Sequence, residues 1–107
     1  MKRPEASRQK DPYDLSYFKI LIVDDSQFIA NLMASALKAM GVGKILIARD
    51  VSEARRELLN YNAVASSQNI DVIISDWLMP EEDGCELLQW IRRHKSDTIK
   101  FAPVIVC

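Results

Sequence analysis

The stretch "KILIVDDSQF", residues 19–28, has two adjacent aspartates directly after a run of apolar residues. Residues 19–23 are predicted to form a buried β-strand, because four apolar residues follow one another and a polar cluster ends the run. Asp24 and Asp25 carry like charges that repel each other, and a carboxylate near a buried strand loses part of its hydration. The pair therefore indicates either the cap of a following helix or a site for a positive charge.

Length and charge exclude several classes of protein. A chain of 107 residues is enough for one domain with a modest hydrophobic core. The net charge of −1 and the lack of a long Lys/Arg run argue against a nucleic-acid-binding surface. No segment approaches the roughly 18 consecutive apolar residues of a membrane span, and no apolar stretch follows the basic N-terminus as in a secretory signal. We therefore expect a cytoplasmic protein that binds neither nucleic acid nor membrane.

The chain is expected to consist of a flexible leader, residues 1–17, and a folded domain, residues 18–107. The leader contains two prolines and mixed charges but no apolar periodicity, which is typical of a segment without its own core. Tyr13, Leu15 and Tyr17 are the leader residues with side chains that could dock on the domain.

Strands and helices are predicted to alternate from Phe18 onward. Gly41 is placed to end the first helix, and "DVSE" at residues 50–53 has the spacing of a capping box that opens the second. Strands are expected at 19–23, 44–48, 70–75 and 103–107, and helices at 26–40, 50–60 and 84–94. This alternation of continuously apolar strands with helices predicts an α/β fold with a doubly wound parallel sheet.

Acidic residues follow two of the predicted strands. Asp24 and Asp25 come after the first strand, and Asp76 comes after the third. Ligands of open parallel sheets bind beyond the C-terminal ends of the strands. We therefore expect these three carboxylates to converge on one small pocket.

Three segments resemble the response-regulator receiver domain of two-component signalling: "ILIVDDS" at 20–26, "VIISDWLMPEEDG" at 72–84 and "PVIVC" at 103–107. The similarity extends from residue 18 to residue 107. It implies a flavodoxin-like receiver fold with strand order 2-1-3-4-5. It also implies that Asp76 is the phosphoacceptor.

The resemblance further implies a Mg²⁺ site and a partner. Asp24 and Asp25 would bind Mg²⁺ directly or through water, with Asp76 and the backbone carbonyl of Leu78 as further ligands. A hard divalent cation prefers such oxygen ligands and would offset the repulsion of the pair. The expected function is a phosphorelay module that takes a phosphoryl group from a histidine kinase or phosphotransfer protein, and not a conventional enzyme.

The sequence departs from the family pattern after the fourth predicted strand. We expect this chain to lack four features that the resemblance implies: the fifth strand, the last two helices, the switch Ser/Thr that would follow Cys107 and the Lys of the fifth strand. We expect a fragment of a longer receiver, or a chain completed by a partner, a homodimer or a swapped dimer. The alternative function is a truncated pseudo-receiver that acts only as a protein-interaction module.

Two further interpretations compete for the acidic residues. Asp24, Asp25 or Ser26 could serve only to cap the first helix. A phosphate-transfer enzyme of the haloacid-dehalogenase type also uses a strand-end aspartate and Mg²⁺, but its nucleophile lies in a DxD pattern after the first strand. The sequence "DDS" at residues 24–26 does not have that pattern.

Overall fold

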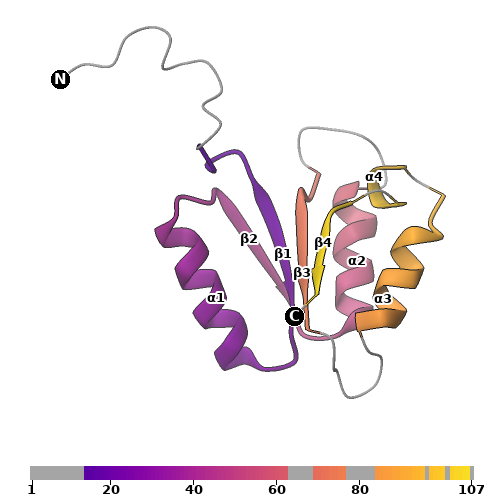
Figure 1. Cartoon of the computed structure of the whole chain (residues 1–107), viewed down its shortest axis with the longest axis horizontal. Coiled ribbons are helices and arrows are strands. Elements are labelled where there is room, and N and C mark those ends of the chain that lie inside the picture. The colour runs from indigo at the N-terminus through magenta and orange to yellow at the C-terminus, as the bar shows by residue number, and fades with distance from the viewer. Residues whose placement is uncertain (1–13, 63–68, 77–83, 96, 101, 107) are drawn as a thin grey trace, which may run out of the picture.

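The computed structural model describes residues 14–62, 69–76, 84–95, 97–100 and 102–106 of the chain. Its helices and strands follow one another along the chain as shown in Figure 1. They are β1 (Lys19–Val23), α1 (Gln27–Ala39), β2 (Lys44–Ala48), α2 (Val51–Asn62), β3 (Val72–Ser75), α3 (Gly84–Arg92), α4 (Asp97–Lys100) and β4 (Val104–Val106).

The four strands form one parallel sheet in the order β2-β1-β3-β4. Val23, the last residue of β1, lies opposite Ala48 of β2 and Ser75 of β3, and Ser75 lies opposite Val106 of β4. All four strands therefore end at one edge of the sheet (Figure 1). The predicted doubly wound parallel sheet is confirmed, and the order agrees with the first four strands of the order 2-1-3-4-5.

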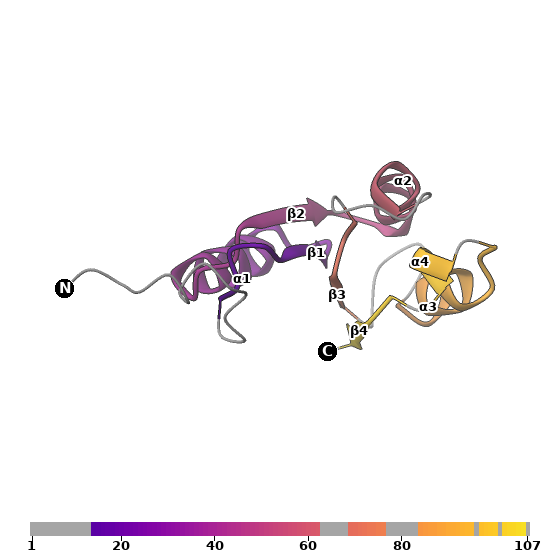
Figure 2. The same ribbon diagram turned by 90° about the horizontal axis from the view of Figure 1, so that it is seen from above.

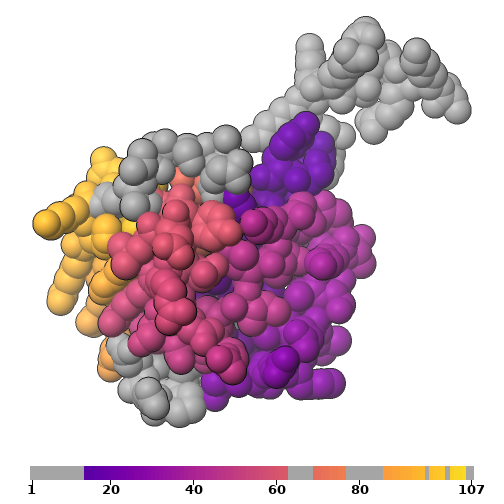
Figure 3. All heavy atoms as spheres, turned by 180° about the vertical axis from the view of Figure 1, so that it is seen from behind, coloured from indigo at the N-terminus to yellow at the C-terminus, as the bar shows by residue number. Residues whose placement is uncertain are grey.

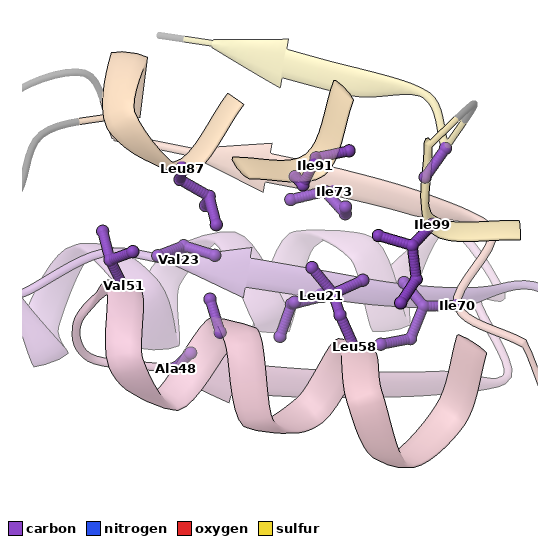
Figure 4. Packing of buried hydrophobic residues seen from close by; sticks show 12 residues of the cluster. Leu21, Val23, Ala48, Val51, Leu58, Ile70, Ile73, Leu87, Ile91 and Ile99 are labelled. Carbon is purple, nitrogen blue, oxygen red and sulfur yellow. The ribbon is translucent and has the colours of Figure 1, made fainter. Parts of the chain in front are cut away.

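Three helices cover one face of the sheet. Leu21 and Val23 of β1 and Ile73 of β3 are fully buried on this face. Figure 4 shows them pointing toward apolar side chains of α2, α3 and α4. The remaining buried members of this cluster are Ala48, Val51, Ala54, Leu58, Ile70, Leu87, Ile91, Ile99 and Ala102. This face holds the main core, and it fixes β1 and β3 side by side.

Among the described helices, α1 alone packs on the other face, apart from the other three (Figure 1 and Figure 2). Ile20 and Ile22 of β1 are buried there against Ala30 of α1. Ile74 of β3 is half-buried, and Ile105 of β4 keeps 53% of its surface exposed. This face is therefore less completely covered than the face packed by α2, α3 and α4.

The ends of the predicted elements agree with the structure where local signals set them. β1 and β2 have the predicted bounds. The Ser26 hydroxyl caps α1 by accepting a hydrogen bond from the amide of Ile29 (3.2 Å). Gly41 follows the helix with φ +98°, a conformation that favours glycine.

The capping box at the start of α2 differs from the prediction by one residue. The Asp50 carboxylate accepts from the amide of Glu53 as expected (2.8 Å). The Glu53 carboxylate, however, accepts from the amide of Arg49 (3.0 Å), one residue before the cap, and its side chain also pairs with the Arg49 guanidinium (3.1 Å). Both residues still satisfy amide groups at the start of the helix.

Other predicted bounds differ from the structure by one or two residues. α1 is Gln27–Ala39 instead of 26–40, α2 begins at Val51 instead of residue 50, and β4 begins at Val104 instead of residue 103. α2 runs to Asn62 instead of residue 60, β3 begins at Val72 instead of residue 70, and α3 ends at Arg92 instead of residue 94. β4 is described as 104–106, and residue 107 lies outside the described residues. The short helix α4 was not predicted.

Long-range contacts explain the longer α2 and the presence of α4. The side chain of Asn62 is buried; it accepts from the amide of Ile70 (2.6 Å) and donates to the carbonyls of Ile70 (3.1 Å) and Thr98 (3.2 Å). The Thr98 hydroxyl donates in turn to the Asn62 carbonyl. Ile99 of α4 is fully buried in the core. These bonds tie the end of α2 to the segment that leads into β3 and to α4.

The described part of the leader makes one apolar contact with the domain. Leu15 is half-buried and packs with the cluster under α1, and its carbonyl accepts from the amides of Phe18 (3.0 Å) and Gly43 (3.1 Å). Tyr17, the second possible docking residue, is 70% exposed and does not dock on the domain. Tyr13 lies outside the described residues.

Candidate metal centre

Three aspartates lie together where β1 and β3 end. The amide of Asp24 donates to the carbonyl of Ala48 (3.0 Å), and the amide of Asp76 donates to the carbonyl of Val23 (2.8 Å). The hydrogen-bonding pattern of the sheet thus continues one residue beyond each strand and sets the direction of both backbones. One carboxylate oxygen each of Asp24, Asp25 and Asp76 lies within 4.8 Å of the others. The expected convergence of these carboxylates is observed.

The three carboxylates differ in their access to water. Asp24 is 6% exposed, Asp76 is half-buried and Asp25 is exposed. They line a cavity of about 320 Å³. The cavity is therefore open to a small cation and its water ligands, while the Asp24 carboxylate is shielded from water.

Apolar side chains form another wall of the same cavity. Ile29 and Met33 of α1 and Ile74 of β3 line it together with the aspartates. These three apolar residues were not predicted to belong to the site. Ile29 and Met33 are four positions apart on one helix, so their shared face was predictable. That this face meets the strand ends depends on how α1 packs on the sheet.

Asp24 also takes part in the local structure at the start of α1. Its Oδ1 atom accepts from the amide of Ser26 (2.9 Å). The helix cap itself is Ser26, so the capping alternative holds for Ser26 and not for Asp25. A carboxylate has about four acceptor positions, so one amide bond leaves Asp24 able to bind a cation. The bond orients Asp24 for such a role.

The donor set fits a hard divalent cation such as Mg²⁺. All three candidate side chains supply carboxylate oxygens, and among the described residues that line the cavity none carries a positive charge. Three negative charges at this distance repel one another, and a divalent cation would offset that repulsion. Mg²⁺ is typically bound by one or two carboxylates together with several waters, for which the open side near Asp25 leaves room.

One predicted ligand cannot be placed. Leu78, whose backbone carbonyl was expected to complete the ligand set, lies outside the described residues. The structure thus brings together three of the four predicted metal ligands. Their roles as ligands and the role of Asp76 as phosphoacceptor stay predictions.

A parallel sheet with aspartates after its strands is typical of a class of proteins, and the sequence matches the model of the same class. The family model of the response regulator receiver domain matches residues 20–107. The chain belongs to this family of two-component signalling domains.

Curated relatives agree with this assignment. A chemotaxis protein CheY homolog of Campylobacter jejuni is 31% identical over 78 residues, which cover 73% of this chain and 55% of the relative. Chemotaxis protein CheY1 of Helicobacter pylori is 28% identical over 88 residues, which cover 82% of this chain and 64% of the relative. The chain thus spans little more than half the length of the Campylobacter protein.

Solved receiver structures have the same fold. The chemotaxis response regulator CheY4 of Vibrio cholerae superimposes with a TM-score of 0.70 at 30% identity, over 83% of this chain and 66% of that one. The receiver domain of the histidine kinase CKI1 from Arabidopsis thaliana, solved in complex with Mg²⁺, gives a TM-score of 0.72 at 25% identity, over 87% of this chain and 70% of that one. The predicted flavodoxin-like receiver fold is confirmed.

No helix in the described part of the chain is long and apolar enough to cross a membrane.

Proposed function

We propose that this chain is a phospho-accepting receiver module of a two-component phosphorelay. Asp76 would take a phosphoryl group from a histidine kinase or a phosphotransfer protein, with Mg²⁺ as cofactor. The observation that carries the proposal is the approach of the Asp24, Asp25 and Asp76 carboxylates to within 4.8 Å at the carboxyl edge of the sheet. An acidic cluster of this kind, on this fold, is suited to bring a cation and an aspartate nucleophile to the same phosphoryl group.

Asp76 is the best candidate for the nucleophile because of its place in the sheet. It follows β3, next to β1, and its backbone is held by the bond from its amide to Val23. Its half-buried side chain reaches the cavity, where a phosphoryl group could approach it. A carboxylate oxygen would attack phosphorus in line as the bond from phosphorus to the donor nitrogen breaks, which gives an aspartyl phosphate and a free imidazole on the donor.

Asp24 and Asp25 are assigned to cation binding. Asp24 is fixed by its bond from the Ser26 amide, and Asp25 is exposed beside it. Bound there, Mg²⁺ would neutralise negative charge on the transferring phosphoryl group. The Mg²⁺ complex of the CKI1 receiver, a structural neighbour, supports this choice of cation.

The chain would act in the cytoplasm, where its donor would be a kinase or phosphotransfer protein. Neighbours that are themselves receiver domains of histidine kinases support such a donor. The chain would promote its own phosphorylation and would not act as a conventional enzyme on a separate substrate.

A second candidate function, a protein-interaction module without phosphotransfer, is favoured by exposed apolar residues. Phe28 and Leu32 of α1 are 74% and 59% exposed, and Ile105 of β4 is 53% exposed. Phe28 and Leu32 are four positions apart on α1 and therefore lie on one face of the helix. An exposed apolar patch of this kind is typical of a contact with another protein. Such a contact is also compatible with a homodimer.

Phosphoryl transfer from a small donor separates the two candidates. The chain would be incubated with acetyl phosphate with and without Mg²⁺, and the intact mass would be measured over time. We expect one phosphoryl group per chain with Mg²⁺, little with EDTA and none in Asp76→Asn. If the chain is folded but stays unlabelled, phosphoryl acceptance is rejected and the interaction module remains as the candidate function.

A further inference from the structure

A second pocket lies between α2 and α3 and shares no lining residue with the acidic cluster. The two helices lie side by side on the main-core face (Figure 1 and Figure 2). Figure 3 shows that the atoms of α2 form part of the molecular surface there. The pocket has a volume of about 660 Å³, which is in the range of roughly 300–1,000 Å³ that is usual for small-molecule sites.

Three cationic side chains and one carboxylate line this pocket. The cations are Arg55 of α2 and Arg93 and Lys95 after α3, and the carboxylate is Glu86. The pocket is therefore positively charged although the whole chain has a net charge of −1. The carbonyl end of α3 contributes only about half a negative charge nearby, which the two full charges of Arg93 and Lys95 outweigh.

Three flat side chains in the lining of the pocket lie close to one another. The guanidinium carbon of Arg55 lies 5.7 Å from the centroid of the Trp90 ring, and the His94 ring lies 5.0 Å from it at 58°. Trp90 is half-buried, so part of its indole remains accessible. Indole and guanidinium planes are the surfaces on which nucleobases stack.

The charges are ordered along α3. Glu86 lies near the start of the helix, Trp90 one turn further, and Arg93 after the end. The amide of Arg93 still donates to the carbonyl of Gln89 (3.1 Å), so the helical geometry continues to Arg93. Seven helical steps separate Glu86 from Arg93 by roughly 10 Å. An acceptor, a flat ring and a cationic end thus follow one another in a line.

We propose that this pocket binds a nucleoside phosphate. The base would stack on Trp90 and Arg55, and the phosphates would bind Arg93 and Lys95. The Glu86 carboxylate would accept a hydrogen bond from a ribose hydroxyl or an exocyclic amino group of the base. Arginine suits this ligand because its guanidinium both stacks on aromatic rings and pairs with phosphate oxygens. The site is separate from the acidic cluster, so its test does not depend on the proposed phosphotransfer.

Titration of the whole chain with ATP tests the proposal. EDTA in the buffer keeps cations from the acidic cluster, and calorimetry measures the affinity. We expect saturable binding of one ATP per chain, weakened about 10-fold by Arg93→Ala and by Lys95→Ala and about 5-fold by Trp90→Leu. Lys38→Ala, which removes an exposed lysine of α1 on the other face of the sheet, should change the affinity less than 2-fold.

Two partial ligands separate a nucleotide site from a simple anion site. Inorganic triphosphate and adenosine should each bind at least 10-fold more weakly than ATP. The proposal is overturned if ATP does not bind saturably, if triphosphate binds as tightly as ATP, or if Arg93→Ala and Lys95→Ala leave the affinity unchanged. Both of these residues are exposed, so their variants should fold even if Trp90→Leu does not.

Discussion

The substitution Asp24→Asn should stabilise the metal-free chain. It removes one negative charge from the cluster of three carboxylates that lie within 4.8 Å of one another. The asparagine can keep the local structure, because its side-chain oxygen can still accept from the amide of Ser26. The substitution therefore isolates the effect of charge from the effect of shape.

The size of the effect follows from Coulomb's law. Two charges 4.8 Å apart repel each other by about 0.9 kcal/mol in water and by about 3.5 kcal/mol at an effective dielectric constant of about 20. Asp25 is exposed, so its interaction with Asp24 lies near the lower value. We expect the free energy of unfolding to rise by about 1–2 kcal/mol at low salt, which would raise the melting temperature by about 4–8 °C per kcal/mol.

Thermal unfolding in EDTA and in Mg²⁺ measures both consequences. Mg²⁺ should stabilise the wild type by mass action and stabilise Asp24→Asn less, because the variant has lost a ligand. Asp97→Asn is the control for a change of one charge, because Asp97 is exposed in α4, away from the cluster. If Asp24→Asn is less stable than the wild type in EDTA, then Asp24 acts mainly through its local bonds and the repulsion argument is wrong.

Three further results are expected. Asn62→Ala should lower the free energy of unfolding by about 2–4 kcal/mol in denaturant titrations, because it leaves buried amide and carbonyl groups of Ile70 without their bonds; a loss below 1 kcal/mol would contradict this role. The pKa of Glu53 lies below its ordinary value, first because its carboxylate accepts a hydrogen bond from the Arg49 amide and then because it bonds to the Arg49 guanidinium. Ionised Glu53 therefore stabilises the fold at pH values above its ordinary pKa. This contribution is lost as the pH falls through the lowered pKa. In Glu53→Gln the free energy of unfolding should therefore depend less on pH at acid pH, and an unchanged pH dependence would contradict this role of Glu53. Ile105→Lys should reduce concentration-dependent association in sedimentation velocity, because Ile105 is 53% exposed; equal association of both proteins would exclude this surface.

Elements with local sequence signals were predicted well, and elements that depend on distant contacts were not. β1 and β2 are short apolar runs between polar residues, and α1 has a serine cap and a glycine after its end. The helix α4 has four residues, too few to be stable alone; it is held by the burial of Ile99 and by the bonds between Thr98 and Asn62. No periodicity in the sequence reveals such a contact.

The candidate site was predictable for a topological reason. Parallel neighbouring strands end at the same edge, so aspartates after β1 and β3 must lie close together once the strand order is known. The sequence could not predict that Asp24 is buried and Asp25 exposed, because their burial depends on the path of the chain between β1 and α1. The pocket between α2 and α3 was also missed, because Arg55 and Trp90 come together only through helix packing.

Locating the residue that carries the phosphoryl group tests the central claim most directly. After labelling with acetyl phosphate and Mg²⁺, borohydride reduction converts an aspartyl phosphate to homoserine, and peptide mass spectrometry then locates it. The account predicts homoserine at position 76, and little when EDTA replaces Mg²⁺. Homoserine at position 24 or 25, or no conversion at all in a chain shown to be folded, would contradict it.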